Sequence, residues 1–327
     1  MSGNHKRSIL VTGGTSGMGY ESALELARQH PDFSIVVSAR SDPKSSVAAI
    51  NKTLGQNNVQ FMPMDLSDLS KVRSFAAEWQ KKQFPPIASL VMNAGLQFSG
   101  EVEYSKDGFE KTFAIAHIGH ALLFFLLRPY LADTARIVVV SSGTHDPEQK
   151  SGLPDATYNS AEEKAHPTPE TAKAEGRQRY SSAKLTNVLF TYALHRRLQA
   201  INQRHGKHWT VTALDPGLMP GTGLARDAGA VLNFAFTRIL PKMIPLLRLL
   251  YSPNVHTAEE SGRALARLAT GKEVEGKSGL YYEGTREIKS SKISYDESKQ
   301  EDLWQWSVET LARNAEEQRL FNLEDLQ

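Results

Sequence analysis

A glycine-rich run, TGGTSGMG at residues 12–19, constrains the fold of this chain more than any other feature. It follows the apolar stretch 8–11 and precedes a helical pattern, which predicts a turn between a strand and a helix. Gly13, Gly17 and Gly19 lack the Cβ atom that would keep a diphosphate away from the backbone amides at the helix N-terminus. A glycine-rich turn is weak evidence by itself, so its meaning depends on the rest of the sequence.

A second pattern, YSSAK at residues 180–184, places a phenol and an ammonium group four residues apart on one helical face. In this geometry the cation of Lys184 can lower the pKa of the Tyr180 phenol and make it a usable proton donor. Tyr-x-x-x-Lys also occurs by chance. Here it follows the glycine turn, an Asn-Ala-Gly sequence and a pair of serines after a strand, and this order indicates one common site.

Apolar, β-branched runs alternate with helical patterns along the chain. The runs are continuously hydrophobic, which is typical of strands buried on both faces of a parallel sheet. We expect strands at residues 8–11, 33–38, 59–64, 89–92, 136–141, 209–214 and 279–282. We expect helices at about residues 18–30, 43–54, 68–83, 104–131, 180–204 and 257–270. The sequence therefore predicts an α/β, doubly wound, Rossmann-type fold with seven parallel strands, in which ligands bind at the carboxyl ends of the strands.

The whole chain, residues 1–327, is predicted to form one domain, because it shows no repeat and no second strand–helix series. Its common core spans about residues 8–285, and residues 286–327 form a C-terminal helical extension. Residues 143–179, rich in proline, glycine and charge, form an insertion before the tyrosine helix and are expected to be a lid or a mobile loop. Residues 221–254 are apolar and interrupted by prolines, so they either pack in the core or cover an apolar substrate.

The composition argues against several kinds of function. A formal net charge of +2, without basic runs interleaved with aromatic residues, gives no basis for nucleic-acid binding. There are no cysteines and the ten histidines show no ligand spacing, so we expect no metal site and a reducing compartment. No signal peptide fits before the first strand, and polar residues interrupt the apolar stretch 230–250, so we expect a cytoplasmic protein without a transmembrane helix.

Five motifs in this order resemble those of the short-chain dehydrogenase/reductase family, and the resemblance covers roughly residues 8–285. They are the TG-x-x-x-G-x-G turn, Asn-Ala-Gly after the fourth strand, two serines after the fifth, Tyr-x-x-x-Lys, and Pro-Gly after the sixth. The residues that carry them are Thr12, Gly13, Gly17, Gly19, Asn93, Ala94, Gly95, Ser141, Ser142, Tyr180, Lys184, Pro216 and Gly217.

The resemblance implies hydride transfer between a nicotinamide and a carbonyl carbon, with negative charge developing on the carbonyl oxygen. Tyr180 would supply the proton, and Ser142 would hold the oxygen by a hydrogen bond. Lys184 would stay charged, lower the pKa of Tyr180 and bind the cofactor ribose. We prefer Ser142 to Ser141 because the catalytic serine of the family is usually the second of such a pair. A strand-end cap is the alternative role.

The end of the second strand, SARSDPK at residues 38–44, bears on the choice of cofactor. NAD-preferring sites place an acidic residue there, whereas an arginine accommodates the 2′-phosphate of NADP(H). Arg40 and Lys44 resemble the NADPH-binding pair of retinol dehydrogenases and protochlorophyllide reductases. Asp42 is the dissenting residue, but it is better placed to cap the following helix. We therefore expect NADP(H) as the cofactor.

Further cofactor contacts follow from the resemblance. Asp65 and Leu66 resemble the family's adenine contact, although Asp65 could instead cap its own loop, and Thr222 lies where related branches place a hydroxyl near the carboxamide or diphosphate. The expected cofactor site comprises Thr12, Gly13, Thr15, Ser16, Gly17, Met18, Gly19, Arg40, Lys44, Asp65, Leu66, Asn93, Ala94, Gly95, Tyr180, Lys184, Pro216, Gly217 and Thr222.

One position departs from the family. The helix before the fifth strand usually carries a sequence resembling Asn-His-Leu-Gly-His, whose asparagine bends the helix and orders a water molecule that leads from the lysine to solvent. This chain has AHIGH at residues 116–120, so Ala116 lacks that side chain, although a backbone carbonyl could still hold the water. His117 is either a substitute or a half-buried histidine with satisfied hydrogen bonds. The change puts the proton relay in doubt, and not the Ser-Tyr-Lys set.

Segments outside the common motifs resemble the protochlorophyllide reductase-type branch: PGLMPGTGLARD at 216–227, SGLYY at 278–282, and DLWQWSVETLA at 302–312. No cysteine accompanies Tyr180, so the photochemistry of that branch is not implied. The leading hypothesis is an NADPH-dependent oxidoreductase that reduces a ketone or aldehyde of a hydrophobic small molecule, or catalyses the reverse reaction.

Two other functions remain open. A dinucleotide-binding scaffold or sensor would keep the fold and lose turnover, and Ala116 is its only support. Epimerases and dehydratases of the extended branch prefer TG-x-x-G-x-x-G, which the Gly17-Met18-Gly19 spacing opposes.

The expected partner is a hydrophobic small-molecule substrate. We expect residues 230–250 to close over it, and the candidate lining or core residues are Leu232, Phe234, Phe236, Ile239 and Leu247. The alternative is peripheral membrane contact by the same surface. Dimers of the family often pair through the Tyr-x-x-x-Lys helix, but the insertion and the C-terminal helix could block that face. Monomer and homo-oligomer therefore both remain open.

Overall fold

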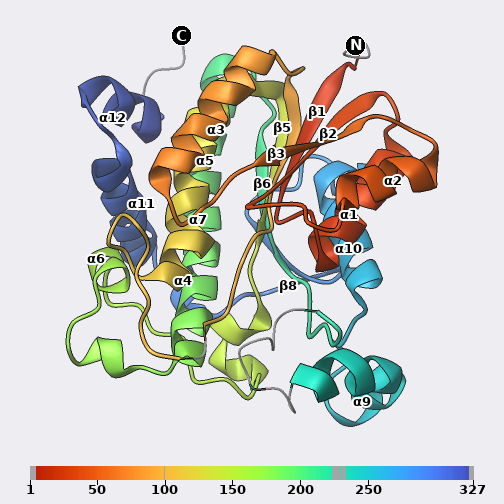
Figure 1. The fold of residues 1–327 in the computed structure, drawn as a ribbon. Coiled ribbons are helices and arrows are strands. Elements are labelled where there is room, and N and C mark those ends of the chain that lie inside the picture. Colours follow the sequence, from red (N-terminus) through yellow and green to blue (C-terminus); the bar gives the residue numbers. More distant parts are fainter. Residues whose placement is uncertain (1–4, 99, 223–228, 230–232, 324–327) are drawn as a thin grey trace.

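The computed structural model describes residues 5–98, 100–222, 229 and 233–323, and its centre is one twisted sheet (Figure 1). The strand order is β3-β2-β1-β4-β5-β6-β7-β8, in which the first seven positions pair in parallel. The strands are β1 (Arg7–Thr12), β2 (Phe33–Ala39), β3 (Val59–Pro63), β4 (Ile87–Met92), β5 (Leu131–Val140), β6 (Thr210–Asp215), β7 (Leu280–Glu283) and β8 (Arg286–Ile288). The order reverses beside β1, as in a doubly wound fold.

The prediction of seven strands was wrong by one, because β8 adds an antiparallel edge strand. A tight turn with Gly284 at a positive φ of 55° returns the chain, and Glu283 pairs with Arg286 across it. The strand has only three residues and two of them are charged. It therefore carries no apolar run by which a sequence pattern could identify it.

Helices cover both faces of the sheet, and each face has its own buried apolar cluster. On one side lie α1 (Gly17–Gln29), α2 (Ser46–Leu54) and α10 (Ala258–Thr270). On the other side lie α3 (Leu69–Lys82), α5 (Gly119–Leu127) and α7 (Gly176–His205), with α11 (Glu297–Leu311) and α12 (Ala315–Asn322) outside them. The predicted start of α10 is confirmed: Thr257 and Glu260 form a reciprocal capping box.

The helix expected over residues 104–131 begins later, because residues 104–110 form a small loop closed by a bridge between Tyr104 and Glu110. A short α4 (Lys111–Phe113), a π-helical turn (Ala114–Ile118) and α5 then follow without a break. The run Lys111–Tyr130 is long and apolar enough to cross a membrane by length and composition. However, 89% of that apolar window is buried inside the fold, which is the environment of a core helix.

Two segments lie outside the sheet and its covering helices. The insertion expected at residues 143–179 ends at residue 175, because α7 begins at Gly176. It contains short 3-10 turns and α6 (Ala161–Ala165), and its Tyr158 hydroxyl donates to Asp302 of α11 at 2.6 Å. Residues 233–251 form a π-helical turn (Ala235–Ile239), a 3-10 turn (Leu240–Met243) and α9 (Ile244–Leu250). This second segment projects from the body of the molecule (Figure 1).

Candidate active site

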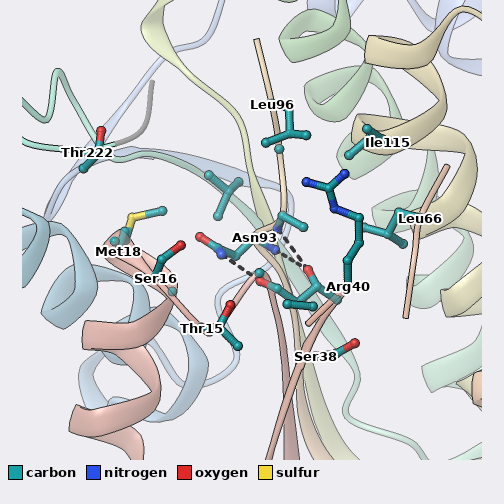
Figure 2. A pocket seen from close by; sticks show the side chains of 18 of the residues that line it. Thr15, Ser16, Met18, Ser38, Arg40, Leu66, Asn93, Leu96, Ile115 and Thr222 are labelled. Carbon is teal, nitrogen blue, oxygen red and sulfur yellow. Dashed lines mark hydrogen bonds between the residues drawn. The ribbon is translucent and has the colours of Figure 1, made fainter. Parts of the chain in front are cut away.

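A cavity of about 630 Å³ lies at the carboxyl ends of the central strands. Its lining contains every residue expected to bind the cofactor except Gly217, and it contains Tyr180 and Lys184 but not Ser142. The other lining residues are Ser38, Ala39, Ser41, Met64, Leu96, Gln97, Ile115, Val140, Ser141, Met219, Gly221 and Ala258. Figure 2 shows Asn93 in the middle of this cavity, with Met18 and Thr222 to one side and Arg40 to the other.

The glycine-rich turn leaves no room for side chains at Gly13 and Gly19. Gly13 has a φ of +67°, and a Cβ on it would lie 3.0 Å from the Cα of Ala94. Gly17, with a φ of +54°, begins α1, and no side chain caps the first turn of that helix. The free backbone amides of α1 therefore open beside the cavity, an arrangement that suits a diphosphate.

Thr12 joins the glycine turn to the end of β4. Its hydroxyl oxygen accepts hydrogen bonds from the amides of Asn93 and Ala94 at 2.9 and 3.0 Å. The Asn93 side chain donates in return to the Thr12 carbonyl at 2.7 Å. The Asn-Ala-Gly motif thus fixes β1 and β4 against each other at the cavity floor. Gly95 leaves space for the lysine, because a Cβ there would lie 3.2 Å from Lys184 Nζ.

Arg40 and Lys44 follow β2, are exposed, and line the same end of the cavity. Asp42 lies between them, but both its carboxylate oxygens accept backbone hydrogen bonds at the start of α2, from Ser46 at 2.7 Å and Val47 at 3.1 Å. The preference for Asp42 as a helix cap is thus confirmed. Asp65 accepts two hydrogen bonds from Ser67, so it caps its own loop while also lining the cavity.

Ser142, Tyr180 and Lys184 come together where β5 ends beside α7. The hydrogen bond between the side chains of Ser142 and Tyr180 lowers the pKa of the phenol, but burial and the nearby Asp215 outweigh it and raise that pKa. The sequence analysis expected the Lys184 cation to lower the pKa of Tyr180, and that effect is not seen here. Ser141 has a different role, since its hydroxyl donates to the Lys184 carbonyl at 2.7 Å and ties β5 to α7. This contact leaves Ser142 as the serine that faces the phenol.

Lys184 is 4% exposed, and its Nζ lies 5.5 Å from the centre of the Tyr180 ring. The ammonium donates to the Val140 carbonyl at 3.1 Å. Burial lowers the pKa of Lys184 to about 8, against an opposing effect of the negative charge of Asp215. The lysine therefore changes charge within a range that an enzyme experiences.

Asp215, the last residue of β6, is a buried acid that the sequence patterns did not single out. Its carboxylate accepts from the Gly217 amide at 2.9 Å and from the Asn254 side chain at 2.7 Å. Burial raises its pKa, and its charge acts on both Tyr180 and Lys184. The only available signal was its position, directly before Pro-Gly at the carboxyl end of a parallel strand.

The π-helical turn lies at the position where the family carries its asparagine. His120 Nε2 is 2.8 Å from the Thr12 hydroxyl, and its Nδ1 is 3.1 Å from the Ala116 carbonyl. The Ala116 carbonyl can only accept, so the proton of neutral His120 lies on Nδ1. Nε2 is then left to accept from the Thr12 hydroxyl, which also lies 3.3 Å from the Val91 carbonyl. His117 contacts Ser307 at 2.7 Å and is fully buried, which fits a satisfied core histidine and not a substitute for the asparagine.

The loop after β6 carries the remaining expected residues. Pro216 accepts from Ser261 of α10 at 2.7 Å, and Thr222 donates to the Met219 carbonyl at 2.9 Å. Five residues of the segment 230–250 were expected to line the substrate site or pack in the core. Of these, Phe236 is buried, Leu247 is half-buried, and Phe234 and Ile239 are exposed. None of these four lines the cavity. Leu232 lies outside the described residues.

Comparison with known proteins identifies the family of this chain. A family model described as short chain dehydrogenase matches residues 7–154. Human polyprenol dehydrogenase is 30% identical over 309 residues, which are 93% of this chain and 84% of that protein. Human retinol dehydrogenase 14 is 30% identical over 316 residues, covering 92% of this chain and 84% of its own length.

Solved structures share the fold. An uncharacterized protein from Mycobacterium paratuberculosis superposes with a TM-score of 0.66 at 25% identity, over 94% of both chains. A blue fluorescent protein from a metagenomic library, in complex with NADPH, superposes with a TM-score of 0.59 at 20% identity, over 86% of this chain and 99% of its own. Together with the motifs and the two human relatives, these likenesses place this chain in the short-chain dehydrogenase/reductase family, within its retinol dehydrogenase-like branch.

Proposed function

We propose that this protein is an NADPH-dependent oxidoreductase that reduces a ketone or aldehyde of a hydrophobic small molecule to an alcohol, or catalyses the reverse. The observation that carries the proposal is that Tyr180 and Lys184, with Ser142 bonded to Tyr180, line the same cavity as Arg40 and Lys44. Two relatives named for polyprenol and retinol, both apolar alcohols, support this substrate class.

The chain's own residues fit a dinucleotide. The uncapped amides of α1 and the turn at Gly13 suit a diphosphate, and the cavity continues to two exposed cations. Arg40 and Lys44 would form charge-assisted hydrogen bonds with a 2′-phosphate, which NAD(H) lacks. Bound NADPH would supply the hydride.

The side chains at the other end would manage the proton. Burial keeps Tyr180 protonated at neutral pH, so its proton is available to the substrate oxygen as negative charge develops there. Ser142 would donate a hydrogen bond to the same oxygen. Protonated Lys184 would stabilise the phenolate that remains. Leu96 and Met219, which line this cavity, offer apolar contacts for the substrate.

The alternative of a weakly active dinucleotide-binding scaffold rests on Ala116, where the family's asparagine is absent. His120 bonds the Ala116 carbonyl and connects it to Thr12, so the helix distortion is held without the asparagine side chain. The presence of Ser142, Tyr180 and Lys184 together favours the enzyme over the scaffold. An epimerase or dehydratase is disfavoured further by the Gly17-Met18-Gly19 spacing.

The test is oxidation of NADPH, followed by absorbance, with a panel of apolar ketones and isoprenoid aldehydes. Tyr180→Phe should keep cofactor affinity and lose turnover by about 10²–10⁴-fold, the usual contribution of a general acid. Tyr192→Phe is the matched control, because Tyr192 lies on the same helix and bonds Ser290, away from the cavity. Near-normal turnover of a folded Tyr180→Phe variant would contradict the assignment, and inactivity of the wild type on every substrate would favour the scaffold.

A further inference from the structure

The projecting segment, residues 233–251, exposes an apolar surface that nothing in the described part of the chain covers. Leu249 and Leu250 are 80% and 75% exposed. The other exposed large apolar residues of the segment are Phe234, Ile239, Met243, Leu246 and Tyr251. Elsewhere in the described ranges only Tyr104 and Tyr295 are large apolar residues with comparable exposure. Such a concentration is unusual for a surface that faces only water.

The segment packs on the body of the protein through one side only, and this packing leaves the apolar side chains of its other side exposed. Phe236 and Ile244 are buried, and the Phe236 carbonyl accepts from the Gly221 amide at 2.8 Å. Arg248 bonds both the Val255 carbonyl and the Glu260 carboxylate. One set of apolar side chains thus holds the segment in place, while Leu249 and Leu250 remain outside.

The exposed surface is also cationic. No acidic residue occurs between positions 233 and 258, although the chain as a whole is nearly neutral. Arg238 and Lys242 are exposed, and neither forms an ion pair with an acidic side chain of the described residues. Apolar side chains with lysine and arginine beside them match the interface of a bilayer that contains anionic lipids.

Other occupants fit this surface less well. Two copies joined symmetrically through it would bring Arg238 and Lys242 of each copy close to the same residues of the other, without acidic partners. Closure over a substrate does not account for Leu249 and Leu250, because neither lines the cavity and the segment is already fixed to the body. We propose that residues 233–251 bind the surface of an anionic lipid bilayer.

The placement of this surface links it to the cavity. Gly221, which bonds the segment, lines the cavity together with Met219 and Thr222. A bilayer bound by the segment therefore lies beside the loop that borders the substrate end, and a lipid-dissolved substrate has a short path to it. Membrane binding itself does not depend on the proposed reaction, so the two proposals can fail separately.

The experiment is co-sedimentation of the full chain with vesicles of phosphatidylcholine alone and of phosphatidylcholine with phosphatidylserine. The wild type should bind the phosphatidylserine vesicles and release them at high salt. The double variant Leu249→Glu/Leu250→Glu should bind about tenfold more weakly or worse, and Arg238→Glu/Lys242→Glu should lose the preference for phosphatidylserine. Tyr104→Glu is the control, since it places the same charge on an exposed ring elsewhere.

Each variant is checked for folding by its thermal unfolding and for an intact cofactor site by NADPH binding, neither of which should change. Absence of wild-type binding to either vesicle would overturn the proposal, and so would equal binding by the Leu249→Glu/Leu250→Glu variant. If light scattering instead shows a wild-type dimer that this variant converts to a monomer, without lipid binding, the surface is an interface between copies of the chain.

Discussion

At the scale of single residues, the environment of Lys184 opposes its positive charge. Its ammonium is buried and contacts one backbone carbonyl, and the buried Asp215 is the group that favours its charged form. The balance leaves the pKa of Lys184 at about 8, which makes its charge the most sensitive part of the proposed mechanism to pH.

We therefore expect kcat/KM for carbonyl reduction to fall as the pH rises through about 8, because deprotonated Lys184 can no longer stabilise a phenolate. Asp215→Asn should move this inflection to lower pH, since Asp215 raises the pKa of Lys184. The measurement is a pH profile with one apolar substrate. Lys184→Arg keeps a cation throughout this range, so its residual activity should show no inflection there. An Asp215→Asn inflection at unchanged or higher pH would contradict the prediction.

Cofactor choice is a second property of individual side chains. A charge-assisted contact from Arg40 to a 2′-phosphate is worth roughly 1.5–3 kcal/mol, so Arg40→Asp should weaken NADPH binding by about 10- to 150-fold. Affinity for NADH should stay or improve. Fluorescence titration with both cofactors measures this, and Lys52→Asp, the same charge change on an exposed lysine outside the cavity, is the control. If the wild type binds NADH as tightly as NADPH, Arg40 is only a surface residue.

Residue motifs find members of this cavity where the candidate chemistry is local in sequence. The glycine turn, Arg40, Asn93, Tyr180 and Lys184 each belong to a short pattern, and the structure brings them to one cavity. Asp215 could not be found in this way. Its carboxylate bonds the side chain of Asn254, which lies 39 residues further along the chain, and a single acid after an apolar strand gives no sign of that partner.

At the scale of elements, hydrophobic runs locate the seven parallel strands because most of their residues are buried, most completely in the central strands. Boundaries were less accurate. Strand β5 begins at Leu131, five residues before the expected start, since its first half contains exposed Asp133 and Thr134. Conversely, the helix predicted over residues 104–131 begins only at Lys111, where Glu110 caps its first turn. Both boundaries were misplaced for local reasons. Polar residues hide the first half of a strand, and a helix cap cannot be recognised from an apolar pattern.

The segment 233–251 shows another limit of sequence reasoning. From composition alone, the segment could pack in the core, cover a substrate or contact a membrane. Apolar residues are expected in all three environments, so the sequence cannot distinguish them. Phe236 is buried and Leu249 is exposed within one short stretch. Phe236 and Leu249 differ in burial because only one side of the segment packs against the loop at Gly221. That side is determined by tertiary structure, which the sequence pattern does not reveal.

At the scale of the whole molecule, the C-terminal helices complete the core on one face of the sheet. Trp304 of α11 is fully buried, stacks on Phe190 of α7 with ring centres 5.7 Å apart, and meets the edge of Phe125. Phe321 of α12 stacks on Phe125 at 4.7 Å. These residues lie beyond the common core expected at residues 8–285, yet they cover the Tyr-x-x-x-Lys helix through which relatives often dimerise.

This cover predicts that the protein is a monomer at micromolar concentration. A dimer through α7 would require α11 to leave, and losing the burial of Trp304 alone costs about 3–5 kcal/mol, as a Trp304→Ala substitution would. The outer surface of α11 offers no substitute interface, since its exposed residues include Glu297 and Glu309, and a symmetric contact would place like charges together. Light scattering after gel filtration, in the absence of lipid, should give the mass of one chain. A dimer that persists across dilution, with α7 amides protected from hydrogen exchange only in that dimer, would show that α11 does not occupy this face in solution.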